Sequence, residues 1–100
     1  MNYSHAFHAG NFADVMKHII VTRLVEYLKK KDAAFRVIDT HAGIGKYDLT
    51  GEIAKRSPEW VDGIGRLLKG GLPQKAQVLA QPYLDVIAGL NVEGEKLATY

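Results

Sequence analysis

The sequence lacks several features that would place it in a particular class. It contains no cysteine, which excludes a disulfide framework and thiolate chemistry. No apolar run reaches the roughly 18 residues of a membrane span, and the first residues have neither the basic nor the apolar region of a signal peptide. We therefore expect a cytoplasmic protein that has no membrane partner.

Charge of one sign and paired prolines are also scarce. Thirteen basic and eleven acidic residues leave a formal net charge of +2, which does not by itself indicate nucleic acid. The three prolines, Pro58, Pro73 and Pro82, are isolated from one another. The composition, 47% hydrophobic and 24% charged over 100 residues, is that of one small globular domain.

A short apolar run at Phe35–Asp39 is the most informative stretch of the chain. Its β-forming residues, Phe35, Val37 and Ile38, are bounded by lysines before and by glycines after. Such a run predicts a strand buried on both faces, as in parallel α/β sheets. Ligands bind just beyond the carboxyl ends of these strands.

A glycine-rich turn follows the predicted strand. Gly43 and Gly45 have no Cβ, so the backbone can turn sharply and approach a ligand closely. Asp39 places a carboxylate beside the turn, and the imidazole of His41 should face whatever the turn holds. This arrangement predicts a cradle for a nucleotide-like cofactor. The G-x-G has no third glycine at the dinucleotide spacing, which disfavours a dehydrogenase and leaves an ordinary turn as the alternative.

Helical signals lie on both sides of this stretch. Asn11 is a predicted N-cap paired with Asp14, and apolar residues at helical spacing predict one apolar face on a helix from about residue 12 to 30. Residues 49–91 carry only helical signals, with Pro58 opening one helix and an interruption expected at Gln81–Pro82. Residues 97–100 resemble the start of a second strand.

Four histidines and a lysine are candidates for chemistry. His5 and His8 form an H-x-x-H pair, which suits either a metal or hydrogen bonding in a polar cleft; we expect no metal because further ligands are lacking. Lys17 and His18 lie early in the first helix, where Lys17 contacts an anion or is simply solvated. Tyr3 begins an aromatic and basic stretch suited to stacking on a base or to packing on the core.

Two long motifs resemble a known family. They are Y-S-H-A-F-H-A-G-N-F-A-D-V-M-K-H at the N-terminus and D-T-H-A-G-I-G-K-Y at the glycine turn, and together they are similar to the start of the bacterial 23S rRNA adenine-N6 methyltransferase family, RlmJ. The resemblance implies an α/β fold: the N-terminal part of a Rossmann-like, class I methyltransferase that uses S-adenosyl-L-methionine. Its RNA partner would be 23S rRNA.

The resemblance also implies a division of the chain and roles for particular residues. Residues 1–48 would hold the tail, first helix and first cofactor strand; 49–91 would be an inserted helical subdomain; and 92–100 would return toward the sheet. Tyr3 and His5 would face the target adenosine. The cofactor-binding residues would be Lys17, His18, Asp39, His41, Gly43 and Gly45.

One family motif has no counterpart in this sequence. The family positions the adenine N6 with a later D-P-P-Y motif, whereas no two prolines are adjacent here. We therefore predict that these residues are the N-terminal part of a longer enzyme, that they include no catalytic residue and that they are inactive alone. The alternative is a non-catalytic RNA- or protein-binding helical module. The sequence leaves the oligomeric state open.

Overall fold

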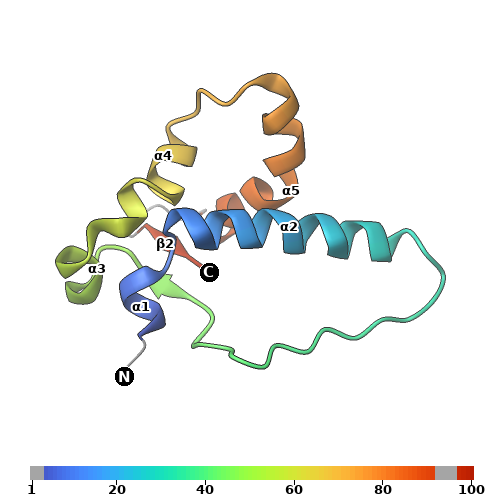
Figure 1. The fold of residues 1–100 in the computed structure, drawn as a ribbon, viewed down its shortest axis with the longest axis horizontal. Coiled ribbons are helices and arrows are strands. Elements are labelled where there is room, and N and C mark those ends of the chain that lie inside the picture. The colour runs from blue at the N-terminus through green and yellow to red at the C-terminus, as the bar shows by residue number, and fades with distance from the viewer. Residues whose placement is uncertain (1–3, 92–96) are drawn as a thin grey trace.

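The computed structural model describes residues 4–91 and 97–100, and these are predominantly helical (Figure 1). The helices are α1 (His5–His8), α2 (Phe12–Lys29), α3 (Glu52–Arg56), α4 (Ile64–Leu68) and α5 (Gln74–Leu90), with a 3₁₀ helix η1 (Pro58–Val61) between α3 and α4. The strands are β1 (Tyr47–Asp48) and β2 (Ala98–Thr99). Among these described helices, none is long and apolar enough to cross a membrane.

Helix α2 begins where the sequence predicts. The side chain of Asn11 accepts a hydrogen bond from the backbone N–H of Asp14 at 2.9 Å, which satisfies one of the free donors at the helix start. The Asp14 carboxylate accepts in turn from the N–H of Gly10 at 3.1 Å. This reciprocal pair resembles a capping box shifted by one residue, so the predicted N-terminus is confirmed.

The core lies where α2 packs against α5 and where α4 closes one end. Its buried side chains come from α2, α4, α5 and the residue after β1, and half-buried apolar residues surround them. The buried members are Val15, Leu49, Ile64, Tyr83 and Ile87. Because they come from segments far apart in the sequence, this cluster joins the first helix to the helical segment after β1.

Only one side of α2 enters this core, which corrects the prediction of a single buried apolar face. Val15 is buried and Ile19 half-buried, but a second set of large apolar side chains on α2 is exposed. That set includes Phe12, Met16, Ile20, Leu24 and Tyr27, each more than half exposed. A helix that is apolar on two sides is typical of one that lies between two layers of a fold.

The strand predicted at Phe35–Asp39 is not formed. In Figure 1 the chain leaves the end of α2, runs as a long irregular connection and returns at β1. Val37 and Ile38 are 67% and 76% exposed, and no backbone hydrogen bond pairs this stretch with another described segment. A strand requires a neighbour for its N–H and C=O groups. The described residues supply none, so they contain no Rossmann-like sheet.

The sheet that does form has two short strands. β1 pairs antiparallel with β2, with Tyr47 opposite Thr99 and Asp48 opposite Ala98. The predicted strand near the end of the chain is therefore confirmed at Ala98–Thr99. Both β2 residues are buried, and the Asn91 side chain bonds to the N–H and C=O of Ala98 at 2.9 and 3.0 Å. These bonds attach the sheet to the end of α5.

The segment after β1 is helical as predicted, with two corrections. The helix expected from Pro58 is divided into η1 and α4, with Gly63 between them. Pro82 does not interrupt α5, which runs through it. Side chains on successive turns connect across this position: Gln77 donates to Gln81 at 3.1 Å, and Gln81 to Asp85 at 2.8 Å. These bonds and the burial of Tyr83 and Ile87 offset the backbone bond lost at the proline.

Candidate functional site

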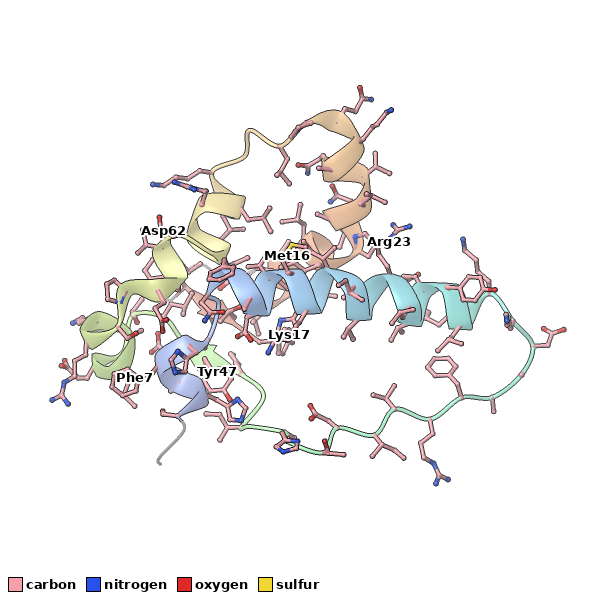
Figure 2. The ribbon with its side chains drawn as sticks, viewed as in Figure 1. Phe7, Met16, Lys17, Arg23, Tyr47 and Asp62 are labelled. Carbon is pink, nitrogen blue, oxygen red and sulfur yellow. The ribbon has the colours of Figure 1, made fainter. Side chains whose placement is uncertain are left out.

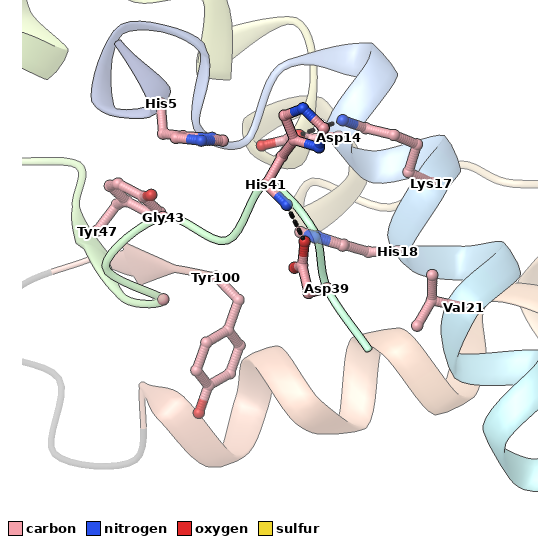
Figure 3. Close-up of a pocket in the computed structure, with 11 residues that line it drawn as sticks. His5, Asp14, Lys17, His18, Val21, Asp39, His41, Gly43, Tyr47 and Tyr100 are labelled. Carbon is pink, nitrogen blue, oxygen red and sulfur yellow. Dashed lines mark hydrogen bonds and ion pairs between the residues drawn. The ribbon is translucent and has the colours of Figure 1, made fainter. Parts of the chain in front are cut away.

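A cavity of about 730 Å³ opens between the N-terminal helices, the glycine turn and the two strands (Figure 3). This volume is in the range of sites for small molecules and cofactors. Its walls come from α1, α2, residues 39–45, β1 and the residue after β2. The side chains and glycines that line it are His5, Asp14, Lys17, His18, Val21, Asp39, His41, Gly43, Gly45, Tyr47 and Tyr100.

The structure brings the sequence-predicted residues together. All six candidate cofactor residues, Lys17, His18, Asp39, His41, Gly43 and Gly45, line this one cavity, and His5 of the candidate RNA pair lines it as well. Tyr3 lies outside the described residues. These positions come from three segments of the chain, and the first and last residues of the set, His5 and Gly45, are 40 positions apart in the sequence.

Sequence reasoning did not assign four of the lining residues to a binding site, namely Asp14, Val21, Tyr47 and Tyr100. Tyr47 closes the second motif, and its position there was the available signal. Asp14 was identified only as a helix cap. Val21 and Tyr100 carry no local signal, because their place at the cavity depends on how α2 and β2 pack in three dimensions.

Contacts among its own side chains and backbone shape the glycine turn. The Asp39 carboxylate accepts from the N–H of His41 at 3.0 Å, and the Thr40 hydroxyl lies 2.8 Å from Nδ1 of the same imidazole. These contacts hold the His41 ring at the cavity (Figure 3). Gly45 has φ +92°, a conformation that glycine adopts far more readily than other residues.

Gly43 is required for a different reason, which is space. A Cβ at this position would collide with the hydroxyl of Tyr47 and would lie 3.0 Å from the His5 ring. The backbone of the turn therefore lies directly against Tyr47 from β1 and His5 from α1, as Figure 3 shows. Glycine permits this close contact, which joins residues 39–45 to His5 of the N-terminal segment.

The α2 wall supplies the charged groups. Lys17 Nζ lies 3.3 Å from Asp14 Oδ1, with the lysine side chain 66% exposed and the carboxylate 20% exposed. Lys17 points from α2 toward the connection that carries the glycine turn, whereas Met16 and Arg23 project from the other side (Figure 2). The ammonium is therefore available to an anionic group in the cavity, while Asp14 remains held by the helix cap.

His18 lies deeper in the same wall. Its Nδ1 is buried and has no hydrogen-bond partner among the described residues. Its ring centroid lies 5.7 Å from that of Tyr83 on α5, with the two planes tilted by 44°. A buried imidazole nitrogen without a partner is costly unless a ligand satisfies it. This atom is therefore a suitable contact for a polar group of a bound cofactor.

Tyr83 supports His18 from the core. Burial raises the pKa of the Tyr83 phenol above its usual value of 10.0, the nearby Thr99 side chain opposes this rise, and the negative charge of Asp14 adds to it. No hydrogen bond of good geometry reaches the Tyr83 hydroxyl within the described parts of the chain. The phenol is therefore neutral at physiological pH.

The H-x-x-H pair does not act as one unit. His5 lines the cavity, whereas His8 bonds to Glu59 at 2.7 Å on the surface of η1. Across residues 4–91 and 97–100, no three His, Cys, Asp or Glu side chains gather as a metal site would require. The structure thus gives the two histidines different surroundings.

The chain was compared with known proteins. The model of the family described as "Ribosomal RNA large subunit methyltransferase D, RlmJ" matches residues 32–100. "Ribosomal RNA large subunit methyltransferase J" of Escherichia coli is 41% identical over 96 residues, which are 95% of this chain and 33% of that protein. The protein of the same name from Haemophilus influenzae is 41% identical over 101 residues, 100% of this chain and 34% of that protein.

The similarity therefore extends over the whole chain, while the chain spans about one third of the length of these relatives. It includes the segment that carries the glycine turn and the helical segment after it. The family match, which covers more than half of the residues, and the identity to both relatives lead to one conclusion: the chain belongs to the RlmJ family of ribosomal RNA large-subunit methyltransferases.

Proposed function

We propose that this chain is the N-terminal part of a cytoplasmic methyltransferase that transfers a methyl group from S-adenosyl-L-methionine to the N6 of an adenine in 23S rRNA. Both relatives carry the name of a ribosomal RNA large-subunit methyltransferase. In the full protein, residues 1–48 would join a Rossmann-like sheet, residues 49–91 would form an inserted helical subdomain, and residues 92–100 would return to the sheet.

One observation carries this proposal. Residues from α1, α2 and the glycine turn, which the motifs alone single out, surround a single cavity of suitable size. Its lining combines two carboxylates, three imidazoles, one ammonium group and the backbone of two glycines. This set suits a nucleoside with ribose hydroxyls and a charged amino-acid end, which is the chemistry of S-adenosyl-L-methionine.

Each residue would contribute binding or orientation. His18 would donate to or accept from a polar cofactor group through its buried Nδ1, and Asp39, His41, Gly43 and Gly45 would shape the turn around the cofactor. Lys17 would lie beside them as the cationic partner. Tyr3 and His5 would hold the target adenosine. When bound, the cofactor supplies a methyl group on a sulfonium centre.

None of these residues needs to act as an acid or a base. The adenine N6 would take the methyl group from the cofactor: the sulfur–methyl bond would break as the N6–methyl bond forms, and S-adenosyl-L-homocysteine and one N6 proton, passed to solvent, would be released. Such a transfer is accelerated mainly by positioning and charge placement. The D-P-P-Y residues that would hold N6 are absent from this sequence, so the proposal assigns no catalytic residue here. The residues present would bind cofactor and orient RNA without a metal.

Titration calorimetry with S-adenosyl-L-methionine, combined with methyl transfer to 23S rRNA by the full protein, tests the proposal. The double variant His18→Ala, His41→Ala should lose cofactor binding, while Lys75→Ala, remote from the cavity, should retain it. If the double variant binds cofactor as tightly as the wild type, the site assignment is wrong. Tyr3→Ala should reduce methylation and leave cofactor binding intact.

A non-catalytic RNA- or protein-binding module would give a different result. It would show no saturable cofactor binding and no dependence of RNA binding on His41. If the protein binds RNA but does not bind S-adenosyl-L-methionine, the enzyme proposal is wrong and the binding-module interpretation is favoured.

A further inference from the structure

Helix α1 is held in place by side chains about fifty residues later in the chain. His8 Nδ1 lies 2.7 Å from Glu59 Oε2, and the Ser57 hydroxyl lies 2.8 Å from the carbonyl oxygen of Phe7. The same hydroxyl is 3.1 Å from Glu59 Oε2. We call His8, Ser57 and Glu59 the clasp. It joins the end of α1 to the beginning of η1.

A backbone contact also joins the residues after α1 to the beginning of α4. The N–H of Ile64, the first residue of α4, donates to the carbonyl oxygen of Gly10 at 2.8 Å. A Cβ on Gly63 would collide with that carbonyl, so the backbone at Gly63 lies directly against the backbone at Gly10 with no side chain between them. The helical segment after β1 therefore contacts the chain on both sides of Ala9.

Helix α1 has little stability of its own. It is four residues long, none of its residues is buried and no side chain caps its start. Isolated helices of this length do not persist in water. Its position must therefore come from tertiary contacts, and α3 and η1 are the elements that it packs against.

The position of α1 matters because it carries His5 to the cavity. His5 lines the cavity from α1, and its ring lies over Gly43 (Figure 3). The clasp lies at the opposite end of this one-turn helix, and none of its three residues lines the cavity. A change in the clasp can therefore alter where His5 lies without touching the cavity directly.

We propose that the clasp is a positioning device by which the inserted helical segment holds the N-terminal arm, defined here as residues 5–10, so that His5 lies at the cavity and can contact RNA. The inference rests on the proposed function and deepens it, because it gives residues 57–59 a role in substrate binding rather than in cofactor binding. His8, Ser57 and Glu59 are positioning residues, and none touches the reacting atoms.

The expected size of the effect follows from exposure. The His8 and Glu59 side chains are 41% and 42% exposed, so the pair alone is weak. Glu59 Oε2 nevertheless lies within hydrogen-bond distance of both His8 Nδ1 and the Ser57 hydroxyl. The single hydrogen of that hydroxyl is shared between Oε2 and the carbonyl oxygen of Phe7, which is the nearer acceptor. Loss of the clasp should lower the fraction of molecules with the arm in place, and apparent substrate affinity falls by that same fraction.

Steady-state kinetics on the full protein tests this role. Glu59→Ala should raise the KM for 23S rRNA about threefold to tenfold and leave the Kd for S-adenosyl-L-methionine within about a factor of two. The matched control is Glu52→Ala on α3, which removes the same charge from an 82% exposed side chain whose nearest lysine nitrogen is 3.9 Å away. The control should leave both constants unchanged.

Coupling and rescue separate positioning from a general loss of structure. His8→Ala should match Glu59→Ala, and the double variant should be no worse than either single variant because each removes the same contact. His8→Asn places an amide donor near the position of the imidazole Nδ1 and should restore most of the RNA affinity. Additive losses, no rescue, or an equal fall in cofactor affinity would overturn the proposal.

A measurement without catalysis keeps the clasp testable apart from the enzyme proposal. Amide hydrogen exchange in residues 5–10 should be faster in Glu59→Ala than in the wild type, while exchange in α5 stays the same. Unchanged exchange in the arm refutes the clasp even if the protein methylates RNA. Absence of methylation by the wild type refutes the proposed function, and the exchange result still decides the clasp.

Discussion

The imidazole of His18 lies against the buried ring of Tyr83, with centroids 5.7 Å apart, where α2 crosses α5. Tyr83 is 1% exposed and belongs to the core, whereas His18 lines the cavity. A side chain of the helical segment thus supports, from behind, a residue proposed to bind cofactor. This pair therefore joins a core residue to a residue that lines the cavity.

The first prediction concerns the ring of Tyr83. Tyr83→Leu should weaken cofactor binding by the full protein about fivefold or more, because His18 loses the ring that holds it. Tyr83→Phe keeps the ring and should bind as the wild type does. Ile87→Ala, a core change one turn further along α5, controls for stability. If it weakens binding as much as Tyr83→Leu, the effect is general destabilisation and the pair has no special role.

The second prediction concerns the Tyr83 hydroxyl and pH. Burial raises the pKa of this phenol above 10.0, so the unfolded chain loses the proton first as pH rises. Ionisation of this phenol therefore does not change the free energy of unfolding well below pH 10, and it lowers that free energy as the pH rises past about 10. Tyr83→Phe removes the effect. The difference in free energy of unfolding between this variant and the wild type should stay constant below about pH 9 and should shift in favour of the variant from about pH 9 to about pH 11.

Urea unfolding at several pH values measures this difference. The exposed tyrosines are common to both proteins and cancel in the comparison. A difference between the two proteins that stays constant across this range would show that the Tyr83 phenol ionises in the native state as easily as in the unfolded chain.

Local signals predicted local structure well. Asn11 and Asp14 identified the start of α2, because a cap depends only on neighbouring residues. Five glycines and histidines of the two motifs line one cavity, while His8 and Gly10 of the first motif do not, and the binding roles of the five stay predictions; they are His5, His18, His41, Gly43 and Gly45. The strand at residues 35–39 was wrong because a strand depends on a partner elsewhere. Val37 and Ile38 have β-forming side chains, but no described segment lies beside them.

Other features needed three-dimensional information. No pattern in the sequence links His8 to Glu59, which are 51 residues apart, or places Tyr83 against His18. The apolar residues of α2 were predicted as one face, yet they divide between the core and an exposed stripe. Periodicity gives the direction in which a side chain points, whereas the element that lies in that direction depends on the whole fold.

The third prediction tests why α5 continues through Pro82. Pro82→Ala supplies an N–H at this position and removes the ring that crowds the preceding turn, so the free energy of unfolding should rise by about 1–3 kcal/mol. Gly89→Ala on the same helix is a useful comparison, because its Cβ would meet no neighbour and only helix propensity changes. It should stabilise by about 0.5–1 kcal/mol. A smaller gain from Pro82→Ala than from Gly89→Ala would mean that the helix has already adapted to the proline.

The fourth prediction concerns the contact of Gly43 with Tyr47 and His5. Gly43→Ala introduces a Cβ that collides with the Tyr47 hydroxyl, so the turn must move away from β1 or the tyrosine must leave the cavity. Cofactor binding by the full protein should fall about tenfold or more, since displacements of an ångström are costly at a binding site. Calorimetric titration measures the loss.

A second substitution identifies the cause of that loss. Tyr47→Phe removes the oxygen that the new Cβ meets, so Gly43→Ala combined with Tyr47→Phe should recover part of the affinity. Recovery remains partial because the His5 ring still lies 3.0 Å from the same Cβ. Tyr47→Phe alone should bind nearly as the wild type does. If the double variant is no better than Gly43→Ala, the glycine is needed for the conformation of the turn itself, and its contact with Tyr47 is incidental.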